Sequence, residues 1–598
     1  MSTAILTGPP APGSSLDGDL RSLGFDVRIA SGAEEAGALL TAVPAGERVA
    51  LVDPRFVGHL HALRLALTDP RFPAAGVPGA LTAQGGARPA LARALSEVSV
   101  TSGAPAAPAD DLPGSLADAL DADGVAVHRP QLGTLVATVP TDAEARHAAR
   151  AAVEAVDDEA VRLRSAVKAH DGFFTTFFIS PYSRYIARWC ARRGLTPNQV
   201  TTASLLTALI AASCAATGER GGYVAAGVLL LVSFVLDCTD GQLARYALKY
   251  STMGAWLDAT FDRAKEYAFY AGLALGAARD GDDVWALALG SMVLMTCRHV
   301  VDFSFNEANA DGTGATAKTG LALSDRLDGL GWTVWARRMI ILPIGERWAM
   351  IAVLTAVTSP RIVFWALIVG CAFGACYTTA GRVLRSLTRK AGRTDRAARA
   401  LADLADSGPL AQAVAKAARR LALPAPVVAF LGAALVVGCA LGAGPGVTAA
   451  AAAGYAVLAG VAVARPLKGA LDWLVPPLFR AAEYTTVLVL AVRSDSPGAL
   501  PAAFGLVAAV AYHHYDTVYR IRGGTGAPPA WLVRVTGGHE GRTLLVTVLA
   551  ALLAGRGDDF ALALTALAVA VALVVLVESI RFWVSAGAPA VHDEGETA

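Results

Sequence analysis

Four aspartates in one apolar stretch are the residues of this sequence best placed to do chemistry. Asp237 and Asp240 are three residues apart and Asp258 and Asp262 are four apart, so each pair lies on one face of its own helix. The flanking residues are apolar enough to cross a membrane, where an ionised carboxylate is costly unless a positive charge neutralises it. We therefore expect the turn between the two helices to bring both pairs together around a bound cation.

The residue types indicate which cation this would be. Carboxylates without histidine or cysteine among them form a hard oxygen site, which suits one or two Mg²⁺ or Mn²⁺ ions, and such ions commonly hold phosphate. Gly241, Arg245 and Gly254 lie between the pairs. Glycine lets a ligand approach the backbone, and a guanidinium group complements phosphate. The alternative is a set of buried ion pairs with Arg245, Arg263 and Lys265, which would not need this placement of glycines.

The fixed spacing resembles the signature of the CDP-alcohol phosphotransferase family. All eight of its fixed positions are matched, by Asp237, Asp240, Gly241, Ala244, Arg245, Gly254, Asp258 and Asp262. The resemblance covers about residues 171–385 and includes Gly194–Thr201, which is similar to the family's entry into its first membrane helix. Members are six-helix membrane enzymes that displace CMP from a CDP-linked lipid or alcohol with a second alcohol. The resemblance implies a transferase of phospholipid biosynthesis.

The resemblance also implies a role for each residue of the signature. One metal ion would be held by Asp237, Asp240 and Asp258, and a second by Asp237, Asp258 and Asp262. Asp262 would also take the proton from the incoming hydroxyl group. The cytidine diphosphate pocket would be lined by Gly241, Ala244, Arg245 and Gly254.

The substrates are left open by the sequence. The donor would be CDP-diacylglycerol or a soluble CDP-alcohol such as CDP-inositol, and the acceptor an inositol phosphate, a glycerol phosphate or another polyol. The cations that could bind an acceptor phosphate are Arg298, Arg337, Arg338 and Arg347, of which Arg347 is favoured because it begins a membrane helix. The alternative function is a cation-coupled transporter with an intramembrane acidic site. A cation relay would not need the glycines and the arginine of the signature.

Composition predicts a multi-pass membrane protein of four parts. These are a soluble domain at 1–170, the catalytic membrane half at 171–385, a basic linker at 386–424 and a second membrane half at 425–598. After residue 196, apolar runs long enough to span recur, and we expect about 12 spans in two six-helix halves. Basic loops at Lys318–Arg338 and Arg382–Arg399 place the N-terminal domain and the aspartates on the cytoplasmic side of the cell membrane. A net charge of +1 argues against nucleic acid as a partner.

Residues 1–170 alternate short apolar runs with alanine-rich helical stretches. This pattern predicts a Rossmann-like α/β domain with a largely parallel sheet, a loop at Gly103–Pro113 and a helix at Asp142–Lys168. The domain resembles in outline the nucleotidyltransferase domain that some family members carry. Its first loop has no basic residue before Arg21, however, which is poor for holding a triphosphate. We therefore expect a degenerate nucleotidyltransferase-like domain or a generic scaffold, with Asp53 as a weak candidate metal ligand.

The second membrane half contains a partial repeat of the sequence around the signature. Trp256–Tyr267 (WLDATFDRAKEY) aligns without gaps on Trp473–Tyr484 (WLVPPLFRAAEY), and GERWAMIAVLTA resembles EGRTLLVTVLAA. In this alignment Asp258 becomes Val475 and Asp262 becomes Phe479. We infer a duplicated fold whose second copy has lost its metal ligands, with chance similarity between apolar helices as the alternative. Because family members usually form homodimers, the chain would be either a pseudo-dimer in itself or a homodimer.

Overall fold

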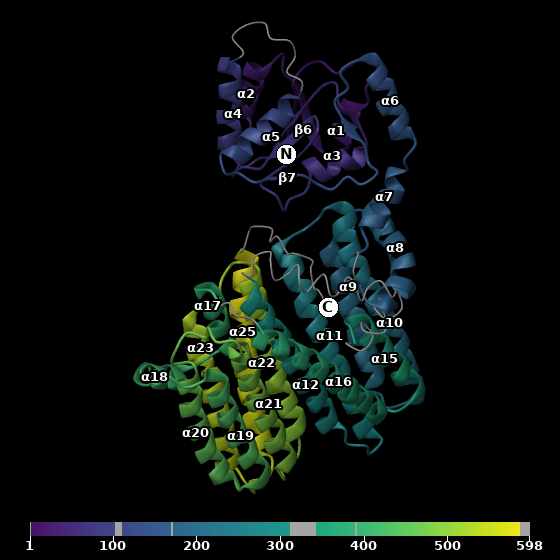
Figure 1. The fold of residues 1–598 in the computed structure, drawn as a ribbon. Helices are drawn as coiled ribbons and strands as arrows, with labels where there is room; N and C mark the ends of the chain where they lie inside the picture. Colours follow the sequence, from purple (N-terminus) through teal and green to yellow (C-terminus); the bar gives the residue numbers. More distant parts are fainter. Residues whose placement is uncertain (1, 102–110, 169–170, 311–341, 389–391, 586–598) are drawn as a thin grey trace.

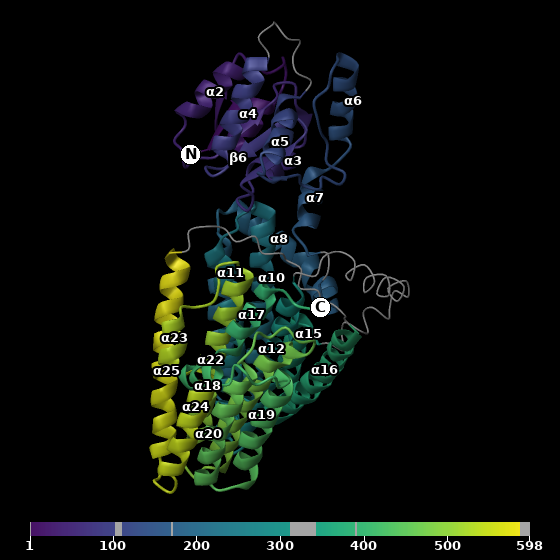
Figure 2. The ribbon, with the colours of Figure 1, turned by 60° about the vertical axis from the view of Figure 1, so that its left-hand side comes forward.

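The computed structural model describes residues 2–101, 111–168, 171–310, 342–388 and 392–585. An α/β domain stands at one end of a long helical region, and helices α6 (Ala143–Glu154) and α7 (Asp158–Ser165) lead from the one to the other (Figures 1 and 2). The sequence predicted one helix over Asp142–Lys168, and the structure has two. The break occurs because the Asp157 carboxylate accepts hydrogen bonds from the backbone of Glu159 and Ala160, which starts a new helix.

The N-terminal domain has a six-stranded sheet in the order β2-β1-β3-β6-β5-β7. Its strands are β1 (Ser2–Leu6), β2 (Phe25–Ile29), β3 (Val49–Val52), β5 (Ala74–Val77), β6 (Ala80–Ala83) and β7 (Val127–His128). A two-stranded sheet joins β4 (Val57–Gly58) to β8 (Ala137–Thr138). The helices are α1 (Leu16–Ser22), α2 (Ala33–Ala42), α3 (Leu60–Leu67), α4 (Arg88–Thr101) and α5 (Leu112–Ala122). The predicted loop at Gly103–Pro113 lies mostly outside the described residues.

The sheet is mixed, whereas the sequence predicted a largely parallel one. β1 is parallel to β2 and β3, and β5 is parallel to β7, but β6 is antiparallel to both of its neighbours. Only Pro78 and Gly79 separate β5 from β6, and Gly79 has a positive φ of 80°. A connection this short closes a hairpin, whereas a parallel pair needs a long crossover. Asp53, at the end of β3, forms an ion pair of 2.8 Å with Arg55, so its carboxylate belongs to a local turn.

The helical region has a helix at each range where the sequence predicted a membrane span. The first half comprises η1 (Thr175–Ile179), α8 (Ser180–Arg192), α9 (Pro197–Ala215), α10 (Arg220–Ala247), α11 (Thr252–Arg279), α12 (Trp285–Asn309), α15 (Ile344–Val357) and α16 (Pro360–Thr388). The second comprises α17 (Asp395–Ala405), α18 (Pro409–Ala417), α19 (Ala425–Gly442), α20 (Pro445–Ala462), η2 (Asp472–Leu474), α21 (Val475–Arg493), α22 (Ala499–Arg522), α23 (Ala530–Thr536), α24 (Gly538–Leu552) and α25 (Asp559–Ser585).

Seven helical segments of the described chain are long and apolar enough to cross a membrane. They are α10, α12, α16, α19, α20, the continuous η2–α21 segment and α25. The other predicted spans coincide with helices but do not meet both criteria: α15 and α24 are short, and α11 carries the aspartates of the signature. Large apolar side chains such as Val228 and Leu573 are more than half exposed on these helices, as lipid-facing side chains would be.

The two halves pack side by side through α12, which lies against α21 and α22 (Figures 1 and 2). Trp285 meets Phe504 edge to face with 5.7 Å between ring centroids, and Trp256 stacks on Trp583 at 6.1 Å. One core cluster of buried apolar residues runs through both halves. The second half is therefore a structural neighbour of the helices that carry the signature.

Candidate functional site

A tight reversal of the chain places the two aspartate pairs opposite each other. Helix α10 ends at Ala247, Leu248 takes a left-handed conformation with φ 51°, and α11 begins at Thr252. The Ser251 hydroxyl accepts a hydrogen bond of 2.9 Å from the Gly254 backbone and so caps α11. Asp237 and Asp240 come from α10, and Asp258 and Asp262 from α11.

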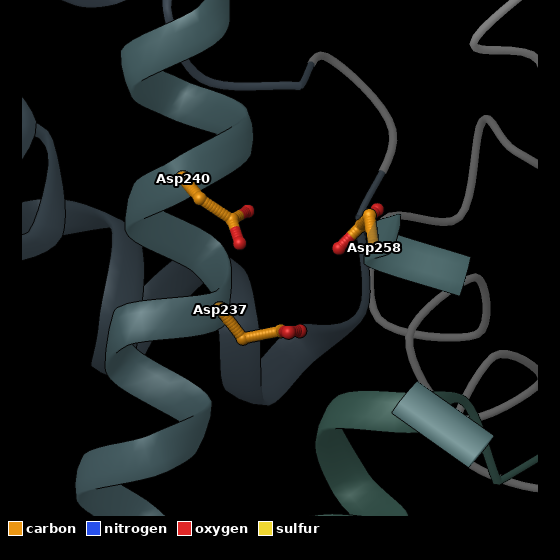
Figure 3. Close-up of side chains that lie close together, drawn as sticks. All are labelled: Asp237, Asp240 and Asp258. Atoms are coloured by element: carbon orange, nitrogen blue, oxygen red, sulfur yellow. The ribbon is translucent and has the colours of Figure 1, made fainter. Parts of the chain in front are cut away.

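Three of the four aspartates form one cluster. Carboxylate oxygens of Asp237, Asp240 and Asp258 all lie within 4.8 Å of one another, and Figure 3 shows the two side chains of α10 pointing across to Asp258. Asp240 is 4% exposed, and its buried Oδ2 has no hydrogen-bond partner among the described residues. A buried carboxylate oxygen without a partner is destabilising unless a cation meets it. The donor set and its geometry fit a divalent cation with oxygen ligands.

Asp262, the fourth aspartate, is not part of this three-residue cluster and is paired with Lys265. The Lys265 ammonium forms an ion pair of 2.8 Å with Asp262, a second one with Asp237, and a hydrogen bond of 3.2 Å to the Ser204 hydroxyl. Lys265 is completely buried. Lys265 thus bridges Asp237 and Asp262, two of the three residues predicted to hold a second metal ion. Lys265 entered the sequence analysis only as a partner in buried ion pairs, although its spacing of three residues from Asp262 puts both on one helix face.

The residues predicted to line the nucleotide pocket sit on the last turns of α10 and the first turn of α11. A side chain at Gly241 would touch the Arg245 guanidinium at 3.5 Å, so these two positions are adjacent. Arg245 Nε donates a hydrogen bond of 2.6 Å to the carbonyl of Ala166, at the end of α7. A Cβ at Gly254 would lie 2.9 Å from Asn198 Oδ1, so this position is closely packed against α9.

Helix α7 also holds the turn of α10 that carries Arg245. Arg162 Nε donates a hydrogen bond of 2.8 Å to the Tyr246 carbonyl, and its guanidinium lies 3.6 Å from the centre of the Tyr246 ring. The Tyr246 hydroxyl donates to Glu159 at 2.7 Å. The segment between the soluble domain and the membrane half is thus hydrogen-bonded to the turn of α10 that carries Arg245.

Residues of α11 and α15 form a buried ionic network next to the aspartates. Glu266 forms an ion pair of 3.0 Å with Arg263 and accepts hydrogen bonds from Arg347 at 3.3 Å and from Tyr270 at 2.7 Å. Arg347 is 3% exposed, so the favoured candidate for the acceptor phosphate is already paired with Glu266. Arg298 is also buried, whereas Arg337 and Arg338 lie outside the described residues.

Comparison with known proteins agrees with the geometry of the first half. Residues 194–376 match the model of the family CDP-alcohol phosphatidyltransferase, and residues 395–598 match a family of unknown function, DUF5941. An archaetidylinositol phosphate synthase of Pyrococcus horikoshii is 33% identical over 132 residues, 22% of this chain and 65% of the relative. A phosphatidylinositol phosphate synthase of Cutibacterium acnes is 33% identical over 146 residues, 24% of this chain and 67% of the relative.

A third relative shares a smaller part of its length. The bifunctional IPC transferase and DIPP synthase of Aquifex aeolicus is 32% identical over 114 residues, 19% of this chain and 26% of the relative. The chain thus spans between a quarter and two thirds of the length of these relatives. The matched region contains the whole signature and the cluster of carboxylates, and by this region the chain belongs to the CDP-alcohol phosphatidyltransferase family.

Proposed function

We propose that the chain is an integral membrane transferase that moves a phosphoalcohol group, such as phosphatidyl, from a CDP-alcohol to a hydroxyl acceptor and releases CMP. The observation that carries this proposal is the cluster of Asp237, Asp240 and Asp258, in which a buried carboxylate oxygen of Asp240 has no partner. Gly241 and Arg245 adjoin the cluster, as a diphosphate ligand would require.

The proposed roles of the residues are those that the family resemblance implies. Asp237, Asp240 and Asp258 would hold Mg²⁺ or Mn²⁺, which when bound withdraws charge from the diphosphate and stabilises the leaving CMP. Asp262, on the same helix as Asp258, takes the proton of the acceptor hydroxyl as general base. The acceptor oxygen forms its bond to the phosphorus while the bond to the CMP oxygen breaks, so no covalent enzyme intermediate is needed. A second ion, as the family resemblance implies, would have to compete with Lys265 for Asp237 and Asp262.

The proposed acceptor is a polyol phosphate, with an inositol phosphate as the first choice. Two of the relatives described above are named for phosphates of inositol lipids, which supports this choice. The charges of Arg298 and Arg347 lie in the same half and would attract a phosphate. The proposed donor is CDP-diacylglycerol, with CDP-inositol as the alternative.

The other parts of the chain have proposed roles as well. The membrane orientation with the soluble domain and the site on the cytoplasmic side follows from the basic loops. We propose that the soluble domain is a degenerate nucleotidyltransferase-like domain and that the second half takes the place of a second subunit in a pseudo-dimer. The shared core between the halves supports the latter role.

The test is CMP release by the purified chain with Mg²⁺ or Mn²⁺. CDP-diacylglycerol and CDP-inositol are each offered with inositol phosphate, glycerol phosphate and no acceptor. We expect release that requires the metal, one donor and one acceptor. A protein that releases no CMP with any pair but carries cations across a vesicle membrane would be the transporter.

A further inference from the structure

The two membrane halves share an ionic scaffold that can be compared residue by residue. In the first half, Arg263 and Arg347 both pair with Glu266, at 3.0 and 3.3 Å. At the aligned positions of the second half, Arg480 and Arg542 both pair with Glu483, at 2.7 and 2.6 Å. The same residue types therefore make the same pairs within the third long helix of each half and between the third and the fifth.

A second contact is repeated at the start of the fifth helix. Glu346, one residue before Arg347, accepts a hydrogen bond from the Phe174 backbone at 3.3 Å. Glu540, two residues before Arg542, accepts hydrogen bonds from the backbone of Gly408 and Ala411, both at 3.0 Å. In each half a glutamate thus fixes the segment that precedes the first long helix. The charged residues kept at aligned positions of both halves belong to this scaffold.

The residues that differ between the halves define a second group. Asp258, Asp262 and Lys265 correspond to Val475, Phe479 and Ala482, and α20, the second long helix of its half, has no acidic residue. The lysine is thus lost together with the carboxylates, although it lies between two scaffold positions, Arg263 and Glu266, that are kept. A lysine needed only to hold the helices together would be expected in both copies.

We infer that Lys265 is a further charged member of the site, and that its ammonium stands where a second metal ion would need Asp237 and Asp262. The site would then take one divalent ion, at Asp237, Asp240 and Asp258, while Asp262 stays free of metal to act as base. Lys265 is a positioning residue in this account, because it acts through Asp262. The part of this inference that concerns catalysis rests on the proposed function, whereas the metal count does not.

The geometry gives the ammonium the features of a substitute cation. It contacts one carboxylate from α10 and one from α11, as a bridging ion would, and Ser204 of α9 supplies a third oxygen at 3.2 Å. Lys265 is fully buried, so its ammonium and the two carboxylates are shielded from solvent. Without any cation there, Asp237 and Asp262 would repel each other in a medium of low dielectric constant.

The experiment counts bound Mn²⁺ on the purified full chain in detergent, by calorimetry and by electron paramagnetic resonance. We expect one ion for the wild type and two for Lys265→Met, with spin coupling between neighbouring ions in the variant alone. Lys265→Arg keeps the charge and should bind one ion. Lys416→Met, a matched change at an exposed lysine of α18, should also bind one. Lys265→Gln serves as a second neutral variant if Lys265→Met does not fold.

Turnover provides the second readout. We expect Lys265→Met to lower kcat for CMP release by about 10²-fold, the size of a general-base contribution, while the donor KM changes little and Lys265→Arg restores part of kcat. Two ions or none on the wild type, or one ion on both wild type and neutral variants, would overturn the inference. If the ions are counted as expected but no donor and acceptor pair gives CMP, the proposed function fails and the metal count stands.

Discussion

The two membrane halves share an ionic scaffold but differ in the carboxylates that lie beside it. In the first half the scaffold lies beside carboxylates with two buried oxygens that have no hydrogen-bond partner among the described residues, Asp240 Oδ2 and Asp262 Oδ1. Asp262 Oδ1 lies 2.8 Å from the Lys265 ammonium, whereas Asp240 Oδ2 has no such cation among the described residues. In the second half Asp406, which follows α17, enters between Arg480 and Arg542 at 2.8 Å from each and lies 3.2 Å from His513. Each charged side chain of that cluster is thus paired with an opposite charge of the same chain. The difference is consistent with a structural cluster in the second half and supports the proposed metal site in the first.

Asp406 also shows how the second half is closed to ligands. Burial raises its pKa, but the Arg542 and Arg480 guanidinium groups and His513 outweigh that effect and hold the pKa of Asp406 well below its ordinary value. The carboxylate is therefore ionised at neutral and mildly acidic pH, and its contribution to stability would be lost only as the pH falls through that lowered pKa. Phe479, which replaces Asp262, is buried and stacks on His539 at 4.1 Å.

The largest effect is expected from removing a ligand of the cluster. Asp240→Asn keeps the volume of the side chain but takes away a charge that the cation needs, and we expect CMP release to fall by about 10³-fold, the loss typical of a main electrostatic contributor. The measurement is the rate of release at saturating donor and Mg²⁺. Asp472→Asn, in a turn of the second half, is the control and should leave the rate unchanged. A comparable loss in the control would indicate general damage to the protein.

The next effect should be on stability and not on catalysis. Asp406→Asn leaves Arg480 and Arg542 with one carboxylate fewer in a buried place, and breaking such a pair costs about 3–5 kcal/mol. We expect a lower melting temperature and, at low temperature, a nearly normal rate of CMP release per folded molecule. A stable Asp406→Asn protein would mean that the cluster contributes little to the second half.

A smaller effect should follow from removing a contact between α7 and α10. Arg162→Ala removes the hydrogen bond to the Tyr246 carbonyl and the contact with its ring, next to Arg245. A hydrogen bond from a charged group contributes about 1.5–3 kcal/mol, so we expect the KM for the CDP-alcohol to rise about tenfold or more with kcat retained. Arg164→Ala, at an exposed position of the same helix, is the matched control. Equal donor KM values for both variants would show that α7 does not position Arg245.

The smallest effect tests the contact between the halves. The Tyr515 hydroxyl of α22 is hydrogen-bonded to His299 of α12, and the Arg263 guanidinium lies 5.2 Å from the centre of the Tyr515 ring. Tyr515→Phe keeps the ring and removes the hydroxyl, which should cost about 1 kcal/mol of stability and change kcat less than twofold. Thermal unfolding together with CMP release measures both. A large fall in kcat would show that the second half acts on catalysis and is more than a support.

The sequence predicted much of the helical region because apolar runs and their ends are local features. The apolar runs expected after residue 196 begin with α9 at Pro197–Ala215, and the second half predicted at 425–598 begins with α19 at Ala425–Gly442. The signature likewise lies within one hairpin, so its three clustered aspartates could be named from spacing. The antiparallel β6 was missed because the pattern of apolar runs does not show which neighbour a strand joins.

Lys265 and Asp406 could not be assigned from sequence for a different reason. The role of Lys265 depends on Asp237, which is 28 residues away on another helix. Asp406 was assigned to a linker, but its partners Arg480 and Arg542 lie 74 and 136 residues further along the chain. Long-range pairs of this kind are set by packing and leave no periodic signal.

The most direct test of the account gives the first half the residues of the second. The double variant Asp258→Val, Asp262→Phe carries the side chains found at Val475 and Phe479 on an otherwise unchanged scaffold. CMP release from CDP-diacylglycerol with inositol phosphate and Mg²⁺ is measured beside the wild type, with thermal unfolding to confirm that the variant is folded. We expect metal-dependent release by the wild type and none by the folded variant. Release by the variant at the rate of the wild type would contradict the claim that the carboxylates of the first half are the site.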